Sequence, residues 1–389
     1  MINLPLATDT WGNEEIKAIK EVVDSNRFTM GKKVRELEVK FADHFGSKYA
    51  VMVNSGSSAN LLAVASLIFS EEHDLKRGDE IIVPAVSWAT TFTPLQQYGL
   101  KIKFVDIDLH TLNLDIDKFE QAITEKTKAV FAVNLLGNPL DYSRLLDIVE
   151  KNNLILIEDN CESMGAKYND KYTGTFGTLG TFSTFFSHHI STMEGGFITT
   201  DNPLLKDILL SLRAHGWTRN LPDDSGIHKK KSNSFYESFN FILPGYNVRP
   251  LEMEGAIGLK QLDKLEEMVS VRRRNGEYFK SLFEDNNDII IQKEIGESSF
   301  FGFSMIISKQ SKINRITLTE KLKENSVECR PIVAGNFTKN DVIKYFDYEI
   351  FEELSNADYI HNNGLFIGNH HYDISEKLQQ VYNLIEEIS

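Results

Sequence analysis

Short apolar runs alternate with amphipathic stretches from about residue 50 onward, and this alternation predicts the architecture. The apolar runs are typical of buried strands, and the stretches between them are typical of helices. In chain order the segments are YAVMVN (49–54), SANLLAVASLIF (58–69), DEIIVP (79–84), KIKFVDI (101–107), KAVFAVNLL (128–136), SRLLDIVEKN (143–152) and LILIEDN (154–160). Apolar strands separated by helices indicate βαβ units, so we predict an α/β fold with a largely parallel sheet covered on both faces.

The pattern changes after about residue 250. We expect a long helix over 251–283, a strand in FFGFSMIIS (300–308) and a further helix near 317–325. This arrangement indicates a large domain over residues 1–250 and a smaller C-terminal α/β domain, with its linking helix, over 251–389. The N-terminal segment can pack against either domain.

Composition and charge exclude several classes of protein. The chain has 389 residues, 41% of them hydrophobic, a net charge of −14 and a pI near 5.3. An acidic chain lacks the clustered cations that nucleic acids require, and the basic run HKKKS (228–232) lies among polar residues, as in a solvated loop. The chain has neither a signal peptide pattern nor a membrane span, so we expect a cytoplasmic protein in which Cys161 and Cys329 are reduced.

Three strand ends carry polar or aromatic residues, and ligands of parallel sheets bind at such ends. In NSGSSAN (54–60), Gly56 permits a tight turn before a helix, and Ser57 adds a hydroxyl to the helix N-terminus, as in a phosphate cup. A plain helix N-cap is the alternative. In PAVSW (84–88), Trp88 can cover a flat ligand or pack in the core.

The third strand end, EDNCES (158–163), presents Glu158, Asp159 and Glu162 without a basic residue nearby in the chain. Such acids can ligate a metal, act as a base or pair with a protonated ring nitrogen. The alternative is that Asp159 caps the next segment.

The order of these segments resembles the sugar-nucleotide aminotransferases of the DegT/DnrJ/EryC1 family, and the resemblance extends over nearly the whole chain. It includes GYNVRPLEMEGAIGLKQL (245–262), which is similar to the family's Gly-Tyr-Asn-x-Arg segment. The resemblance implies a fold type I transferase that binds pyridoxal phosphate. It also implies a large domain with a mostly parallel seven-stranded sheet between helices, and a smaller C-terminal domain.

The resemblance also assigns roles to single residues. It implies that Gly56, Ser57 and Ser183 hold the cofactor phosphate, that Trp88 stacks on the pyridine ring, and that Asp159 pairs with the ring nitrogen and keeps it protonated, so that the ring can serve as an electron sink.

Other assignments concern the rim of the site and a second subunit. Glu162 stands where the family usually has a Gln near the ring hydroxyl, which leaves its hydrogen-bonding role open. The resemblance implies that Asn247 reaches the phosphate in the neighbouring subunit, so the active unit is a homodimer. Arg219, His215 and Arg330 are candidates for binding the substrate diphosphate or the glutamate carboxylate. Surface ion pairing is the alternative for the two arginines.

The segment FFSHHISTMEGG (185–196) departs from the family pattern. The family's cofactor-linked lysine belongs five residues after Ser183, and this chain has His188 there. An imidazole forms no stable covalent link with the cofactor, and Lys167, Lys171 and Lys206 lie in segments that make poor substitutes. The neighbouring His189 is expected to be structural.

Within this family, a histidine at this position resembles the sugar 3-dehydratases, which remove the C3 hydroxyl of a 4-keto-6-deoxyhexose nucleotide. One kind acts on a CDP-sugar with an iron–sulfur cluster, whereas the other acts on a GDP-sugar without one. A cluster held by cysteines needs four of them, and this chain has two. The segments SHHISTMEGG, RAHGWTRNLP and LPGYNVRPLEM resemble the GDP-sugar kind.

The resemblance therefore implies an enzyme of deoxysugar biosynthesis for colitose-containing O-antigen lipopolysaccharide. Its substrates would be GDP-4-keto-6-deoxy-D-mannose and L-glutamate, and its cofactor would be pyridoxal or pyridoxamine phosphate, not covalently bound, without an iron–sulfur cluster. An imidazole with an ordinary pKa of about 6.5 is largely neutral in the cytoplasm, so His188 can act as the base. The alternatives are an aminotransferase that recruits a distant lysine, a CDP-sugar dehydratase and a non-catalytic relative.

Overall fold

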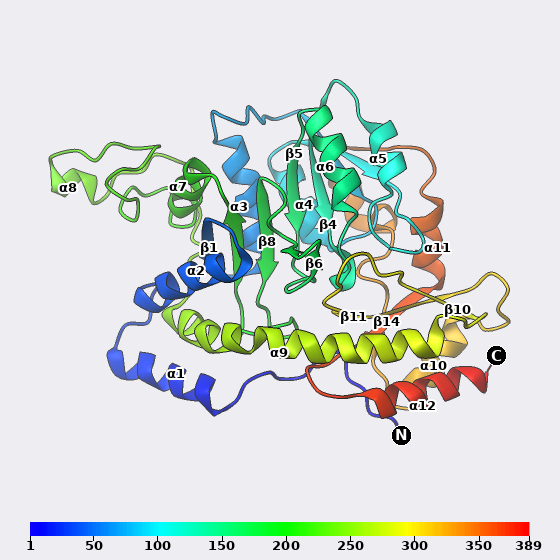
Figure 1. Cartoon of the computed structure of the whole chain (residues 1–389). Coiled ribbons are helices and arrows are strands. Elements are labelled where there is room, and N and C mark those ends of the chain that lie inside the picture. The colour runs from blue at the N-terminus through cyan, green and yellow to red at the C-terminus, as the bar shows by residue number, and fades with distance from the viewer. Residues whose placement is uncertain (389) are drawn as a thin grey trace.

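The computed structural model describes residues 1–388 and places the predicted strands in one large sheet (Figure 1). The strand order is β1 (Tyr49–Val53), β9 (Gly196–Thr200), β8 (Leu179–Ser183), β5 (Ile155–Asp159), β4 (Thr127–Val133), β2 (Glu80–Pro84), β3 (Lys101–Val105) and β13 (Tyr348–Ile350). Only β9 runs antiparallel to its neighbours, which confirms the mostly parallel sheet. The expected count of seven strands was wrong, because β13 joins the edge of the sheet from the C-terminal part of the chain.

Helices cover both faces of this sheet. Neighbouring residues on a strand point to opposite faces, so Ile81 and Val83 enter one core cluster and Ile82 enters another. The first face is covered by α3 (Gly56–Ile68), α4 (Ala89–Gln97), α7 (Pro203–Leu212) and α11 (Ser355–Asn363). The second is covered by α2 (Lys32–Phe45), α5 (Ile116–Ala122), α6 (Tyr142–Lys151) and α9 (Glu252–Phe283).

The long helix α9 passes from the large sheet to a second, smaller sheet (Figure 1). The smaller sheet is antiparallel, in the order β10 (Ile289–Ile291), β11 (Gly302–Ile307), β14 (Gly364–Gly368) and β12 (Cys329–Arg330). The helices α10 (Arg315–Glu324) and α12 (Ser375–Glu386) pack on it. The predicted helices over 251–283 and near 317–325 and the strand in 300–308 are thus confirmed.

The N-terminal segment packs with this smaller unit. Ile2 and Leu4 lie in its core, and Leu4 pairs with Val327. The next helix, α1 (Asn13–Ser25), packs on α9. A boundary at residue 250 stays a prediction, since β13 and the N-terminal segment both cross it.

An arm over residues 219–244 leaves the body of the molecule and carries the short helix α8 (Ser234–Glu237) (Figure 1). The basic run at 228–232 lies in this arm with its lysines exposed, as predicted for a solvated loop. The hairpin of β6 (Lys167–Tyr168) and β7 (Lys171–Tyr172) carries two of the lysines considered above. Within residues 1–388, no helix combines the length and apolar character needed to cross a bilayer.

Candidate active site

The N-terminus of α3 forms the first wall of the site. The Ser55 hydroxyl caps the helix by accepting a hydrogen bond from Ser58 N at 3.0 Å. A Cβ at Gly56 would lie 2.6 Å from Cβ of Ser183, so only glycine lets α3 begin against the end of β8. Ser57 is exposed on the first turn and makes no side-chain hydrogen bond within the described chain. Its hydroxyl and the N–H groups of Gly56 and Ser57, which have no hydrogen-bond partner within the described chain, are therefore free for an anion.

Asp159, at the end of β5, is a buried carboxylate with neutral partners. Its Oδ2 accepts hydrogen bonds from Asn60 Nδ2 at 2.9 Å and from Thr91 Oγ1 at 2.7 Å, and its Oδ1 accepts one from Cys161 N at 3.2 Å. No lysine or arginine pairs with it within residues 1–388. A buried charge without a counter-charge is costly, and a cationic ring nitrogen would compensate it.

Asn60 and Thr91 are site residues that the sequence analysis missed. Asn60 lies one helical turn after Gly56 on α3, and Thr91 lies on the first turn of α4, just after Trp88. Their helical spacing from those residues was a usable signal. Trp88 itself is 58% exposed, so the core alternative for this residue is wrong and its indole is free to cover a flat ligand.

The two glutamates near Asp159 have different surroundings. Glu158 is fully buried and binds the Tyr142 hydroxyl at 2.5 Å and three backbone N–H groups, so it anchors structure. Glu162 Oε2 accepts one hydrogen bond, from Leu136 N at 3.2 Å. Burial, and then the charge of Asp159, raise the pKa of Glu162 to about 7. Glu162 therefore holds a proton for part of the time at neutral pH.

His188 lies in the loop between β8 and β9. Its backbone N–H donates to the Phe185 carbonyl at 2.9 Å, and its ring packs against the Phe301 ring with the centroids 5.2 Å apart. The ring atom Nδ1 is buried and has no hydrogen-bond partner within the described chain. Burial, with a smaller contribution from Arg272, lowers the pKa of His188 to about 4. The imidazole is therefore neutral at neutral pH and able to accept a proton.

The three lysines that could replace the missing amine have other contacts, and His189 is buried next to His188. His189 is fully buried with its Nε2 3.1 Å from the Ser299 carbonyl, which agrees with a structural role. Lys167 and Lys171 lie over the rings of Tyr172 and Phe176, and Lys206 pairs with Asp207.

Comparison with known proteins identifies the family. Residues 9–386 match the model of the DegT/DnrJ/EryC1/StrS aminotransferase family. The chain belongs to this family. It is 57% identical to a GDP-4-keto-6-deoxy-D-mannose 3-dehydratase from Yersinia pseudotuberculosis, over 100% of this chain and 99% of that protein.

Two solved structures of DegT/DnrJ/EryC1/StrS relatives are equally similar along the whole chain. A GDP-4-keto-6-deoxy-D-mannose 3-dehydratase from E. coli with bound hydrated PLP superposes with a TM-score of 0.97 at 56% identity, covering 99% of both chains. A GDP-4-keto-6-deoxymannose 3-dehydratase with a trapped PLP-glutamate geminal diamine also has a TM-score of 0.97, at 55% identity, covering 98% of this chain and 100% of that one. Both confirm the fold type I architecture.

The residues of this family member fit pyridoxal phosphate. The N-terminus of α3 offers free N–H groups beside Ser183. The carboxylate of Asp159, which has no cationic partner, suits a protonated ring nitrogen. Trp88 is exposed and lies three residues before Thr91, which binds Asp159. His188 is the departure from the family pattern, because it supplies no amine for a covalent link.

The remaining predicted residues are Arg219, His215, Arg330 and Asn247. Arg219 projects from the arm with its guanidinium 5.0 Å from the Trp217 ring, His215 contacts the same ring, and Arg330 is exposed on β12. Within residues 1–388, no hydrogen bond, ion pair or ring contact joins them to Asp159 or His188. Asn247 is exposed as well. Their assignments therefore stay predictions.

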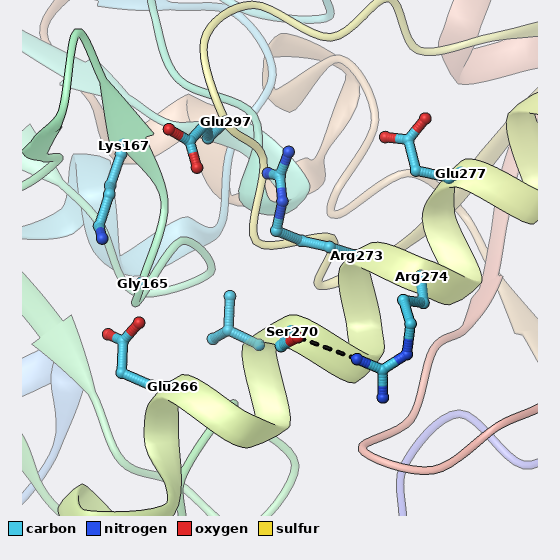
Figure 2. A pocket seen from close by; sticks show the side chains of 9 residues that line it. Gly165, Lys167, Glu266, Ser270, Arg273, Arg274, Glu277 and Glu297 are labelled. Carbon is cyan, nitrogen blue, oxygen red and sulfur yellow. Dashed lines mark hydrogen bonds between the residues drawn. The ribbon is translucent and has the colours of Figure 1, made fainter.

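A separate hollow of about 400 Å³ lies between α9 and the β6–β7 hairpin (Figure 2). Charges of both signs line it, including Lys167, Glu266, Arg273, Arg274 and Glu297. None of the predicted site residues is among its lining residues, so it is not the site described above.

Proposed function

We propose that this protein removes the C3 hydroxyl of GDP-4-keto-6-deoxy-D-mannose, with pyridoxal phosphate as cofactor and L-glutamate as amino donor. The products are GDP-4-keto-3,6-dideoxy-D-mannose, 2-oxoglutarate and ammonia. One observation carries the proposal: a neutral, partly buried imidazole, His188, stands at the position that the family resemblance assigns to a lysine, beside an otherwise intact site. The names of the relatives described above support the substrate and the donor.

The residues of the chain have distinct tasks in this proposal. Gly56, Ser57 and Ser183 bind the phosphate, Asp159 faces the ring nitrogen and Trp88 covers the ring. Bound pyridoxal phosphate supplies a carrier for the amino group and an electron sink. Because His188 cannot form a covalent link, these contacts alone retain the cofactor, which therefore exchanges with free cofactor in solution.

His188 performs the proton transfer. Its neutral imidazole takes a proton within the site and returns it to the departing C3 oxygen, which leaves as water. The two electrons that reduce C3 come from glutamate, which is oxidised to 2-oxoglutarate, and its nitrogen leaves as ammonia. A lysine amine would instead favour retention of the nitrogen on the sugar, because it can return the proton to C4.

A homodimer is part of the proposal. Phe235, Tyr236, Phe239 and Phe241 are between 53% and 77% exposed on the arm, and apolar side chains gathered on a projecting segment mark an interface. A second copy of the chain would cover them and would bring its Asn247 to the phosphate, with His215 and Arg219 near the substrate. Arg330 is proposed for the same anionic groups.

The proposal also includes a biosynthetic pathway for the product and a cellular compartment for the enzyme. The product is a deoxysugar nucleotide of the kind used for colitose and O-antigen. We expect the enzyme to work in the cytoplasm, because both of its cysteines are free thiols and such thiols persist in a reducing compartment.

The test is a reaction with defined substrates. Purified protein, pyridoxal phosphate and glutamate are incubated with either GDP- or CDP-4-keto-6-deoxyhexose, followed by mass spectrometry of the sugar nucleotide and an ammonia assay. We expect loss of one oxygen, with equimolar ammonia, from the GDP-sugar. A stable amino sugar would indicate an aminotransferase, and no turnover of either nucleotide would overturn the proposal.

A further inference from the structure

Arg272 is a buried cation whose hydrogen-bond partners are backbone carbonyls. It lies on α9 and is 5% exposed. Its Nη1 donates to the carbonyl oxygens of Asn369 at 3.0 Å and of Phe301 at 3.3 Å. No carboxylate pairs with it within residues 1–388. A guanidinium presents several N–H donors in one plane, so Arg272 joins the segment before β11 to the segment after β14.

The segment 299–301, which Arg272 binds, forms part of the candidate active site. Phe301 N donates to Leu136 O at 3.0 Å, and Leu136 N in turn donates to Glu162. The Phe301 ring contacts the rings of His188 and His189, with centroid distances of 5.2 and 5.7 Å. The segment therefore touches the proposed base directly.

This segment adopts a conformation that needs external support. Phe300 has a φ of 44°, in the left-handed region that is unfavourable for a residue with a bulky side chain. It packs against Gly137, where a Cβ would lie 2.5 Å from Phe300 N. Contacts from several elements hold it, and they include hydrogen bonds from the charged guanidinium of Arg272.

We propose that Arg272 is a positioning residue for His188: its guanidinium holds segment 299–301 so that Phe301 packs against the imidazole. The proposal rests on the role of His188 as the base. Burial, and then the positive charge of Arg272, lower the pKa of His188, so the imidazole stays neutral and ready to accept a proton.

The other groups around Arg272 do not cancel its charge. His189 lies in the same loop as His188, and His370 and His371 lie in the segment after β14. Burial, and then the charge of Arg272, lower the pKa of each of these three histidines. Lys377 lowers the pKa of His370 further. Asp9 and Lys264 act in opposite directions on the pKa of His371. Among residues 1–388, no carboxylate forms an ion pair or a hydrogen bond with His188.

Two substitutions separate the charge from the geometry. Arg272→Gln keeps N–H donors for the carbonyls but removes the charge, whereas Arg272→Lys keeps the charge but loses the planar fork. Arg274→Gln is the matched control, since Arg274 is exposed on the same helix and its guanidinium contacts Ser270 Oγ (Figure 2). Histidine-selective NMR titration of the cofactor-free protein reports the pKa of His188, and a His188→Asn variant identifies its signal.

We expect Arg272→Gln to raise the pKa of His188 and to move the acidic limb of the kcat profile in the same direction. Arg272→Lys should leave this pKa in place and lower kcat on the order of 10-fold, because Phe301 is held less firmly. Arg274→Gln should change neither quantity. An unchanged His188 titration in folded Arg272→Gln would overturn the electrostatic part.

A wild-type kcat in Arg272→Lys would overturn the positioning part of the proposal. If Arg272→Gln does not fold, the kcat of Arg272→Lys still tests the positioning part. The titration uses no substrate, so its outcome is independent of whether the protein is a dehydratase. A wild-type titration that places the pKa of His188 near its ordinary value would also contradict the proposal.

Discussion

The side chain at position 188 decides which reaction the site can perform. His188→Lys places an amine at the position that the family resemblance assigns to a lysine, and the exposed carbonyl carbon of pyridoxal phosphate reacts with amines. We expect this variant to lose dehydration by on the order of 10²- to 10⁴-fold, the usual contribution of a general base. Borohydride treatment of the loaded variant should give a covalent adduct, detected by intact-mass spectrometry.

His188→Asn is the control for this experiment, because it removes the base without adding an amine. It should lose dehydration and give no adduct. A wild-type rate of dehydration in either variant would contradict the role of His188.

Single residues at strand ends were predictable, whereas their partners across the fold were not. Gly56, Asp159 and His188 stand at or near strand ends, so local pattern and family resemblance were sufficient to name them, although their roles stay predictions. Thr91 reaches Asp159 from 68 residues away in sequence, which no local pattern reveals. Arg272 lies in the run VRRRNG, where a charged residue is expected on the solvent side of a helix.

At the scale of elements, a buried lysine attaches β13 to the large sheet. Lys103 on β3 is 3% exposed and pairs with Glu80 on β2 at 2.8 Å and with Glu349 on β13 at 2.9 Å. Lys103→Met leaves the equally buried Glu80 without its cation. We expect a loss of about 3–5 kcal/mol in the free energy of unfolding, measured by urea denaturation, since breaking a buried pair strands a charge.

Lys101 provides a matched control on the same strand. It pairs with Glu349 while about a third of its side chain is exposed, so Lys101→Met should cost no more than about 1 kcal/mol. The double variant Lys103→Met, Glu80→Gln should regain part of the loss. Equal costs for the two lysines would refute a special role for the buried pair.

The attachment of β13 through polar residues also explains why the predicted sheet lacked one strand. The strands between residues 49 and 160 were predictable because each is a continuous apolar run in a βαβ unit. β13 spans Tyr348–Ile350, is short and mixed in polarity, and gains its place through non-local pairing with β3. The buried Lys103 gives no apolar signal either, so the sheet was predicted without its eighth strand.

At the scale of the whole molecule, the two ends of the chain meet in the smaller unit. Ile2 and Leu4 share a core with α12, and Lys377 Nζ donates to Asn3 O at 2.8 Å. The neighbouring Pro5 and Thr8 bind His370, one of the imidazoles near Arg272. The N-terminal segment is therefore linked through His370 to the surroundings of Arg272.

The proposed dimer predicts which subunit's site Asn247 serves. Service to the partner's site and service to its own site give opposite results in a mixed dimer. Its neighbour Val248 accepts a hydrogen bond from Asn54 N at 3.0 Å in the same chain, so Asn247 lies near its own phosphate cup as well as on the exposed surface. Co-expression of His188→Asn and Asn247→Ala chains with different tags, followed by tandem affinity purification, isolates the mixed dimer. If Asn247 serves the partner's site, one of the two sites combines His188 with Asn247, and about half of the wild-type dehydration rate returns. If Asn247 serves its own subunit, both sites are defective and the mixed dimer is as inactive as either parent, which would refute the shared site.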